Sequence, residues 1–296
     1  MLRAARLPDE YALEEMLHRG HASEVWKAQG PGGKPVAVKL ALSGATASRE
    51  RFATEARCLA ALTHRSVVRM HGHGESLDGR PFLALEWLDG QSVTGLLTER
   101  GGSGLPPRDA VRLLLPIALA LVVAHDRGIV HGDVSADHVM LVHPDPETIL
   151  PKLVDFGAAR RIMPTIPPPR PSEPTVRIVE PPHGGDPAVD VRGFASTIFH
   201  AIAGRRPFTD RASGPSVPRT GLSERDAALW RILAEGLAPG AVHSPTMHDF
   251  ARDLAIWADL RGLDTDITGT PVLGRWLESV RSVTERPRAG GLGHKP

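Results

Sequence analysis

The stretch Ile129-Val-His-Gly-Asp-Val-Ser-Ala-Asp-His-Val-Met-Leu141 is the most informative part of this sequence, together with Lys152-Leu-Val-Asp-Phe-Gly157 behind it. The first stretch offers a carboxylate, Asp133, in a polar loop, and the second places Asp155 directly after an apolar run. A carboxylate that follows an apolar strand suits a hard cation such as Mg²⁺. The two aspartates, 22 positions apart, are therefore a candidate catalytic group and a candidate metal ligand.

On the N-terminal side, the segment Pro35-Val-Ala-Val-Lys-Leu40 alternates, so it predicts a strand with Lys39 and Ala37 on one face. A turn rich in glycine precedes it, as in a hairpin. A lysine on the inward face of a strand costs desolvation unless an anion pairs with it. Residues 48–62 have helical spacing and supply Glu55 as that partner.

Further upstream, Leu17-His-Arg-Gly-His-Ala-Ser-Glu-Val-Trp-Lys-Ala28 has a single glycine, Gly20. Glycine lets backbone N–H groups approach a phosphate closely. Phosphoryl transfer needs a cover for the phosphates, a cation, carboxylates for Mg²⁺ and a base near the attacking hydroxyl. Gly20, Lys39, Asp155 and Asp133 are candidates for these parts, in a fixed order along the chain.

These four stretches resemble the motifs of the protein kinase superfamily, most of all the bacterial serine/threonine protein kinases. The resemblance covers about residues 10 to 260. It implies an α+β, bilobal, protein-kinase-like fold. A small antiparallel-sheet N-lobe with one helix would span residues 10–90, and a larger, mainly helical C-lobe residues 91–262. Residues 263–296 would form a partly disordered C-terminal extension.

The resemblance also implies ATP, with Mg or Mn, as the cofactors. Asp133 would be the catalytic base, and the Lys39–Glu55 pair would hold the α- and β-phosphates. Asp155 and His138 would be the metal ligands. Backbone groups of Glu86 and Leu88, in the stretch 85–90 that resembles the family hinge, would meet the adenine edge, and apolar side chains would clamp its faces. The implied ATP-binding residues are Gly20, Val25, Ala37, Lys39, Glu86, Leu88 and Met140.

The sequence departs from the family at the site itself. His138 stands where the family has a metal-binding asparagine, and imidazole suits Zn or Mn better than Mg. Ser135 replaces a lysine beside the transferring phosphate, which weakens electrostatic stabilisation of the transition state. His18 and Ser23 replace the two outer glycines of the phosphate cover.

The activation segment departs as well. Gly132 replaces the arginine that in the family usually binds a phosphorylated activation loop. Activation by phosphorylation of Thr165, Ser172 or Thr175 is therefore disfavoured. Glu180 is the candidate for the glutamate that ends this segment. Its family arginine partner is Ser244 here.

Three functions remain open. The first is an ATP-dependent serine/threonine kinase, active but slow, that transfers the γ-phosphate to a protein hydroxyl. The second is a pseudokinase that binds nucleotide or a partner protein without useful turnover. The third is a small-molecule kinase, because those enzymes also carry the triplet His131-Gly-Asp133.

Composition limits the partners. Among 296 residues, 35 basic and 34 acidic side chains give a net charge of +1, which favours neither nucleic acid nor a membrane surface. The apolar run Leu113 to Ala124 is shorter than the about 20 residues of a membrane span. Cys58 is the single cysteine, so the chain has no internal disulfide, which suits a reducing cytosol. A protein substrate or regulatory protein and a cytoplasmic location are therefore expected.

Beyond residue 107 the pattern predicts mostly helices, at 109–127, 190–203, 224–236 and 246–261, with a short one at 273–283. The proline-rich stretch 164–174 predicts an exposed loop, and the tail 289–296 predicts disorder.

Overall fold

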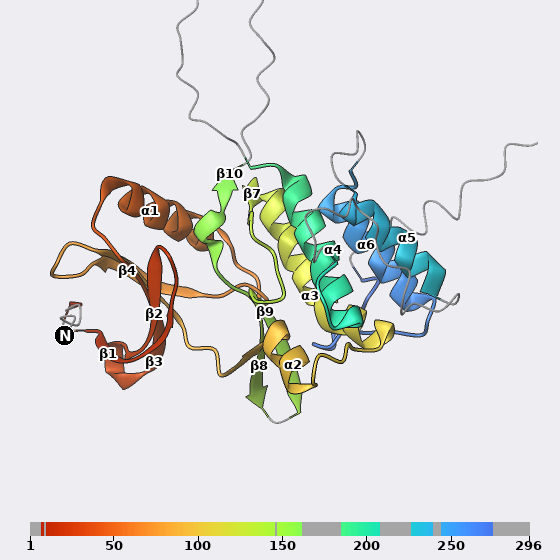
Figure 1. The fold of residues 1–296 in the computed structure, drawn as a ribbon, viewed down its shortest axis with the longest axis horizontal. Helices are drawn as coiled ribbons and strands as arrows, with labels where there is room; N and C mark the ends of the chain where they lie inside the picture. The colour runs from red at the N-terminus through yellow and green to blue at the C-terminus, as the bar shows by residue number, and fades with distance from the viewer. Residues whose placement is uncertain are drawn as a thin grey trace, which may run out of the picture.

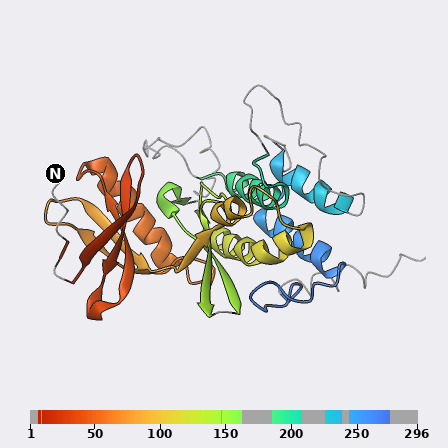
Figure 2. The same cartoon turned by 60° about the horizontal axis from the view of Figure 1, so that its bottom comes forward.

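The computed structural model describes residues 7–8, 10–145, 147–161, 185–207, 226–238 and 244–274. Two lobes follow one another along its long axis (Figures 1 and 2). The first, in red and orange, consists mainly of β-strands, and the second, from yellow to blue, mainly of helices. This is the bilobal α+β fold that the sequence predicts.

The N-lobe is a five-stranded antiparallel sheet in the order β1-β2-β3-β5-β4. Its strands are β1 (Ala12–Arg19), β2 (Ser23–Gln29), β3 (Pro35–Ala41), β4 (Met70–Glu75) and β5 (Pro81–Glu86). The turn between β2 and β3 contains the short 3₁₀ helix η1 (Pro31–Gly33), where Gly32 adopts a φ of 73°. The hairpin predicted there is present.

The alternation along β3 separates the two faces of this sheet. Val36, Val38 and Leu40 are buried in a small core with Ala28 and Phe82. The opposite face, which carries Lys39, looks toward α1 (Thr46–Ala61) and the cavity. The single helix of the lobe buries Phe52, Glu55 and Leu59, among other residues, so burying one face of α1 places Glu55 at the sheet.

The C-lobe is built around α3 (Pro107–Asp126), whose apolar residues are almost all buried. Pro116 lies inside this helix and is itself buried. The helices α4 (Pro187–Ala203) and α6 (Met247–Asp259) pack against it, and α5 (Ala227–Leu237) packs on α4 and α6. Helix α2 (Val93–Glu99) lies beside the connection from the N-lobe. The predicted helices are present with shifted ends. The helix expected from 190 begins at Pro187, because the side chain of Asp186 accepts a hydrogen bond from the Ala188 N–H.

The expectation of helices beyond residue 107 was incomplete, because this lobe also contains two small antiparallel sheets. One has the order β6-β8-β9, from β6 (Gly90–Ser92), β8 (Val139–Asp145) and β9 (Thr148–Leu153). The other pairs β7 (Ile129–Val130) with β10 (Arg160–Arg161). Three of these strands, β6, β7 and β10, have only two or three residues each, so they leave no alternation to detect. They frame the two stretches that carry the predicted chemistry.

The chain after α6 continues to pack on the C-lobe. Leu263 and Val272 are buried in its core, and the Ile267 N–H donates to the Arg112 carbonyl on α3. The helix expected at 273–283 does not begin in the described part, where Leu273 and Gly274 form a turn. The proline-rich stretch 164–174, Glu180 and the tail 289–296 lie outside the described residues.

Within the described ranges, no helix is both long and apolar enough to cross a membrane.

Candidate active site

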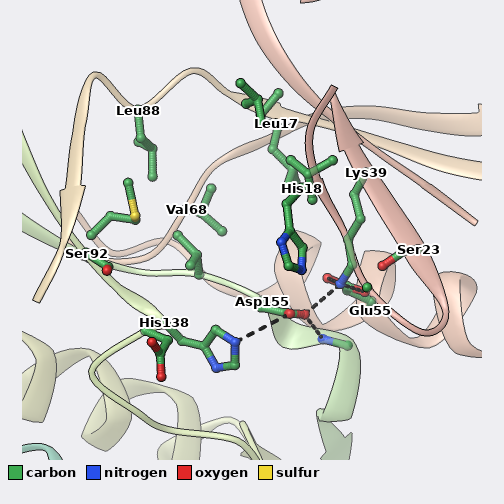
Figure 3. Close-up of a pocket in the computed structure, with 18 of the residues that line it drawn as sticks. Leu17, His18, Ser23, Lys39, Glu55, Val68, Leu88, Ser92, His138 and Asp155 are labelled. Carbon is green, nitrogen blue, oxygen red and sulfur yellow. Dashed lines mark hydrogen bonds and ion pairs between the residues drawn. The ribbon is translucent and has the colours of Figure 1, made fainter. Parts of the chain in front are cut away.

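A cavity of ≈ 980 Å³ opens between the two lobes (Figure 3). Its lining comes from β1, β2, β3, α1 and β5 on one side. On the other side it comes from the C-lobe stretches 129–141 and 152–157, which carry Asp133 and Asp155. Every site residue predicted from the sequence lines it, namely Gly20, Val25, Ala37, Lys39, Glu55, Glu86, Leu88, Asp133, His138, Met140 and Asp155. The fold therefore collects in one place residues that are spread over more than a hundred positions.

At the inner end of the cavity one ammonium group contacts two carboxylates. Lys39 Nζ lies 2.7 Å from Oε1 and 2.8 Å from Oε2 of Glu55, and 2.6 Å from Oδ1 of Asp155. The side chain of Lys39 is 7% exposed and that of Glu55 is 1% exposed, whereas Asp155 is 43% exposed. The buried pair is thus fixed, and the outer carboxylate faces the open space (Figure 3).

The backbone at Asp155 is unusual. Its φ of 61° is the one positive value at a non-glycine residue in the described chain. Its side chain accepts a hydrogen bond from the Gly157 N–H at 3.1 Å and so caps the 3₁₀ helix η2 (Phe156–Ala158). A left-handed conformation at such a residue costs free energy and is typical of functional sites. It turns the Asp155 carboxylate toward Lys39.

Gly157 lies in close contact with the ion cluster. A Cβ at this position would lie 2.9 Å from both Asp155 Oδ1 and Lys39 Nζ, and 3.4 Å from Glu55 Oε2. These three atoms belong to the ion cluster, so a methyl group would push its members apart. The glycine of the predicted Asp-Phe-Gly triplet therefore serves the packing of the cluster.

The charges in the cluster set its titration. Burial raises the pKa of Asp155, but the charge and hydrogen bond of Lys39 outweigh burial and lower that pKa to about 2. His138 lowers it further. Burial raises the pKa of Glu55, the charge and hydrogen bond of Lys39 oppose this only in part, and the charge of Asp155 raises the pKa further. At neutral pH Asp155 is accordingly an anion that can receive a cation.

A fully buried carboxylate on α4, that of Asp190, anchors the backbone of the loop that carries Asp133. Asp190, on α4, accepts hydrogen bonds from the backbone N–H groups of His131 and Gly132, both at 2.8 Å. His125 Nε2 lies 2.8 Å from the same carboxylate. A buried carboxylate is stable only when its oxygens are satisfied in this way. The loop is thus held rigidly beneath the exposed side chain of Asp133.

His131 has a structural role in this loop. Burial lowers its pKa, so the ring is neutral. Its Nδ1 accepts from the Asp133 N–H at 3.2 Å, so the proton is on Nε2, which donates to the Val154 carbonyl at 3.0 Å. The ring also packs edge-on against Phe156, with 4.5 Å between centroids. His131 therefore connects the backbone of Asp133 to the strand that leads to Asp155.

His138 lies between the two aspartates. Its Nδ1 donates to the backbone carbonyl of Asp133 at 2.8 Å, and the Ser135 hydroxyl is 3.3 Å away. Its Nε2 faces Oδ2 of Asp155 over 3.7 Å, as the dashed line in Figure 3 shows. Nδ1 supplies the proton of the hydrogen bond to the Asp133 carbonyl, so Nε2 is the ring nitrogen that could bind a cation together with Asp155.

No three His, Cys, Asp or Glu side chains of the described chain come close enough to hold a metal ion alone. Mg²⁺ is usually held by one or two carboxylates together with substrate phosphates, so Asp155 suits such a shared site.

The outer end of the cavity is apolar. Val25 and Ala37 line it from the N-lobe and Met140 from the C-lobe. Leu88 makes no backbone hydrogen bond to another described residue, so its N–H and carbonyl are available to a planar ligand. The Glu86 side chain points elsewhere. Its Oε1 accepts from Lys152 Nζ at 2.6 Å and from the Arg69 N–H at 2.7 Å.

The substituted positions also have a geometric basis. Gly132 adopts a φ of 83°, and a Cβ there would lie 2.8 Å from the Ala158 carbonyl oxygen. A side chain at 132 would therefore be strained and crowded. Gly20, by contrast, has room for a Cβ, with 3.5 Å to the nearest atom, His18 Nε2.

Several residues of the cavity were not among the predicted site residues. Arg51 lies one helical turn before Glu55 on the same face of α1, a spacing that could have indicated it. Asp137 lies inside the catalytic stretch, where its carboxylate was a visible signal. Val68 and Ser92 carry no local signal, because long-range folding alone brings them to the cavity.

Comparison with known proteins agrees with this geometry. Residues 11–220 match the protein kinase domain family. The chain is similar to the serine/threonine-protein kinase PknL of Mycobacterium tuberculosis, with 31% identity over 250 residues, covering 80% of this chain and 60% of PknL. It is similar to PknI of Mycobacterium bovis, with 30% identity over 238 residues, covering 76% of this chain and 38% of PknI. The chain thus spans less than two thirds of the length of these relatives.

Solved structures give the same result for the fold. The kinase domain of M. tuberculosis PknI superposes with a TM-score of 0.65 at 28% identity, covering 88% of this chain and all of that domain. A single-residue variant of the same domain gives a TM-score of 0.65 at 27% identity, covering 87% of this chain and all of that one. With the family match over most of its described length, this chain belongs to the protein kinase family.

Proposed function

We propose that this protein is an ATP-dependent serine/threonine kinase that transfers the γ-phosphate of ATP to a protein hydroxyl. The observation that carries the proposal is the position of Lys39 Nζ, within 2.8 Å of both oxygens of buried Glu55 and 2.6 Å from Asp155. An ammonium group fixed by one carboxylate, with a second and more open carboxylate next to it, suits phosphates and their cation.

The cavity fits the nucleotide at both ends. The free backbone groups of Leu88 and the apolar surfaces of Val25, Ala37 and Met140 suit a purine ring. Lys39 would contact the α- and β-phosphates, oriented by Glu55. Gly20, in the turn between β1 and β2, would lie over the phosphates, and its N–H already donates to the Ser23 carbonyl.

The carboxylates at the inner end fit a divalent cation shared with the phosphates. Asp155 uses Oδ1 for Lys39 and for the Gly157 N–H, and it presents Oδ2 toward His138 Nε2. We assign Asp155 and His138 as the ligands. When bound, the metal would neutralise charge that develops on the transferred phosphoryl group. The imidazole ligand favours Mn over Mg.

Asp133 would be the catalytic base. Its side chain is 59% exposed and can accept the proton of an incoming hydroxyl. The loop beneath it is fixed by Asp190 and His131, so the carboxylate is positioned before substrate arrives. Ser135 adds no positive charge beside it, for which reason we expect turnover to be slow.

The pseudokinase remains a second candidate because of one observation. His138 Nδ1 approaches Asp133 Oδ2 to 3.5 Å, so a protonated ring would pair with the proposed base and compete for it. In that case nucleotide would bind between the lobes, and the protein would act through a partner protein.

We also propose a protein substrate or a regulatory protein as partner, neither nucleic acid nor a membrane, and a cytoplasmic location. The near-neutral charge and the buried, unpaired thiol of Cys58 support these assignments.

Transfer of labelled γ-phosphate from ATP to a generic protein substrate, with Mg²⁺ or Mn²⁺, tests the proposal. Wild-type protein should label the substrate, and Asp133→Asn and Asp155→Ala should each abolish the label. ATP-dependent stabilisation of the wild type without any label would instead support the pseudokinase.

A further inference from the structure

An exposed arginine lies against the stretch that carries the proposed base. Arg206 Nη2 donates to Oδ2 of Asp137 over 2.6 Å, and the two side chains are 62% and 44% exposed. Asp137 lies four residues after Asp133 and lines the same cavity. Arg206 therefore brings a positive charge to the solvent side of the site, where a substrate hydroxyl must enter.

The backbone that carries Arg206 is held firmly. The residue follows the end of α4, where Gly204 has a φ of 69°. A Cβ at Gly204 would clash with the Gly102 carbonyl oxygen, and one at Gly104 would clash with the Ile202 carbonyl oxygen. Such close packing fixes the turn against the loop before α3. The position of Arg206 is thus a property of the fold.

The surroundings of Asp137 are basic. His200, on the last turn of α4, has its pKa lowered by burial and then by the charge of Arg206, while Asp137 opposes both. Within the described part of the chain, Asp137 therefore has two basic side chains near it, Arg206 and His200. Its Oδ2 already accepts the hydrogen bond from Arg206.

The guanidinium has capacity left for an anion. It carries five N–H donors in a planar fork, and one of them bonds to Asp137. Arg206 makes no other hydrogen bond to the described chain, and its exposure leaves the remaining donors in water. A second carboxylate can therefore bind to it with two parallel hydrogen bonds.

We infer that Arg206 selects protein substrates with an aspartate or glutamate next to the phosphoacceptor serine or threonine, an inference that rests on the proposed function. A basic side chain at that place would have to displace Arg206 from Asp137 and leave a guanidinium unpaired. An acidic side chain binds to donors that have no partner among the described residues, and the existing ion pair stays intact.

Peptide phosphorylation tests this preference. Matched serine peptides differ only in having Glu, Ala or Lys at each position on either side of the serine. At one position the wild type should prefer Glu to Lys roughly tenfold in kcat/KM, as one charge-assisted hydrogen bond of ordinary strength gives. Arg206→Gln should remove the preference and Arg206→Glu should reverse it. The control Arg252→Gln, which removes an exposed arginine paired with Asp249 on α6, should leave it unchanged.

A binding measurement separates this inference from the proposed function. Fluorescent peptides with alanine in place of the acceptor serine are titrated with each variant, so turnover is not needed. Weaker binding of the acidic peptide to Arg206→Gln supports the inference even if no phosphate is transferred, in which case the proposed activity fails alone. Transfer to acidic and basic peptides at equal rates, with equal binding, overturns the inference and leaves the kinase assignment intact.

Discussion

The two sides of the cavity are built differently. On the N-lobe side, Lys39 and Glu55 are buried and in direct contact, and each matches the family motif. On the C-lobe side, Asp133 is 59% exposed, and the positions around it hold Gly132, Ser135 and His138 in place of the usual residues. A buried ion pair tolerates no single change without an uncompensated charge. An exposed side chain tolerates substitution, because water replaces lost contacts.

Because of this difference, we expect changes on the two sides of the cavity to affect stability and activity differently. The Lys39 cluster joins the two lobes beside the proposed nucleotide site, so changes there should damage both folding and activity. The side chain of Asp133 is exposed and that of His138 is partly exposed, so changes at these two positions should alter chemistry and metal use with little effect on folding. The following variants test this contrast.

Lys39→Met should have the greatest effect. This change leaves the Glu55 carboxylate buried without its partner, which costs about 3 kcal/mol of unfolding free energy. It also removes the proposed phosphate contact, so transfer should fall by about a hundredfold or more. Urea unfolding and labelled-phosphate transfer measure the two effects. The control Lys34→Met, on the exposed turn before the same strand, should change neither.

The double variant Lys39→Met/Glu55→Met separates the two effects. Replacing both partners of a buried ion pair with apolar side chains is often neutral for folding. Stability should therefore recover while transfer stays lost. If the double variant is less stable than Lys39→Met alone, the buried pair is not the source of the effect.

A smaller effect is expected from Gly157→Ala. The added methyl would meet the charged groups of Lys39 and Asp155 at 2.9 Å, so the cluster must open. We expect a loss of about 1–3 kcal/mol in stability, as overpacking typically costs. Gly20→Ala is the matched control, because a Cβ there meets only ordinary contacts. Equal melting temperatures of both variants without ligand would contradict the prediction.

His138→Asn tests the C-lobe side. The change replaces imidazole with the amide oxygen that Mg²⁺ prefers, so transfer with Mg²⁺ should rise several-fold relative to transfer with Mn²⁺. The free energy of unfolding should change by less than about 1 kcal/mol, because the ring is partly exposed. His143→Asn, an exposed histidine on β8, is the control. An unchanged metal preference would remove His138 from the metal site.

The pH dependence of stability due to Asp155 should be weaker than all of these. Its pKa falls from 3.8 to about 2 on folding, so it stabilises the folded state above about pH 4. That contribution is lost as the pH falls from 4 toward 2. Because the side chain is 43% exposed, we expect less than about 1 kcal/mol. Urea unfolding should show the difference between wild type and Asp155→Asn shrinking across this range. A constant difference would contradict it.

Much of the architecture could be predicted from local patterns. The alternation along β3 and the apolar spacing of α1, α3, α4 and α6 are strong signals, because each element buries one face. The short strands β6, β7 and β10 carry none, since pairing with distant partners alone defines them. The sequence therefore did not predict the small sheets that flank the stretches with Asp133 and Asp155.

The site followed the same division. Motif spacing was enough to name Lys39, Glu55, Asp133 and Asp155, because the chemistry of phosphate and metal demands those residue types. Val68, Ser92 and the pair Asp137–Arg206 could not be named as neighbours, since 69 positions separate the members of that pair.

Residue type and spacing were enough to specify the kind of fold, the cation and the carboxylates, because local patterns carry that information. How these groups are oriented depends on the folded chain. The left-handed backbone of Asp155 and the contact space at Gly157 set the distances within the ion cluster. The side of His138 that faces Asp155 is likewise set by its hydrogen bond to the Asp133 carbonyl. The distances within the ion cluster and the tautomer of His138 depend on packing between segments that are remote in the chain. No local sequence pattern encodes such packing.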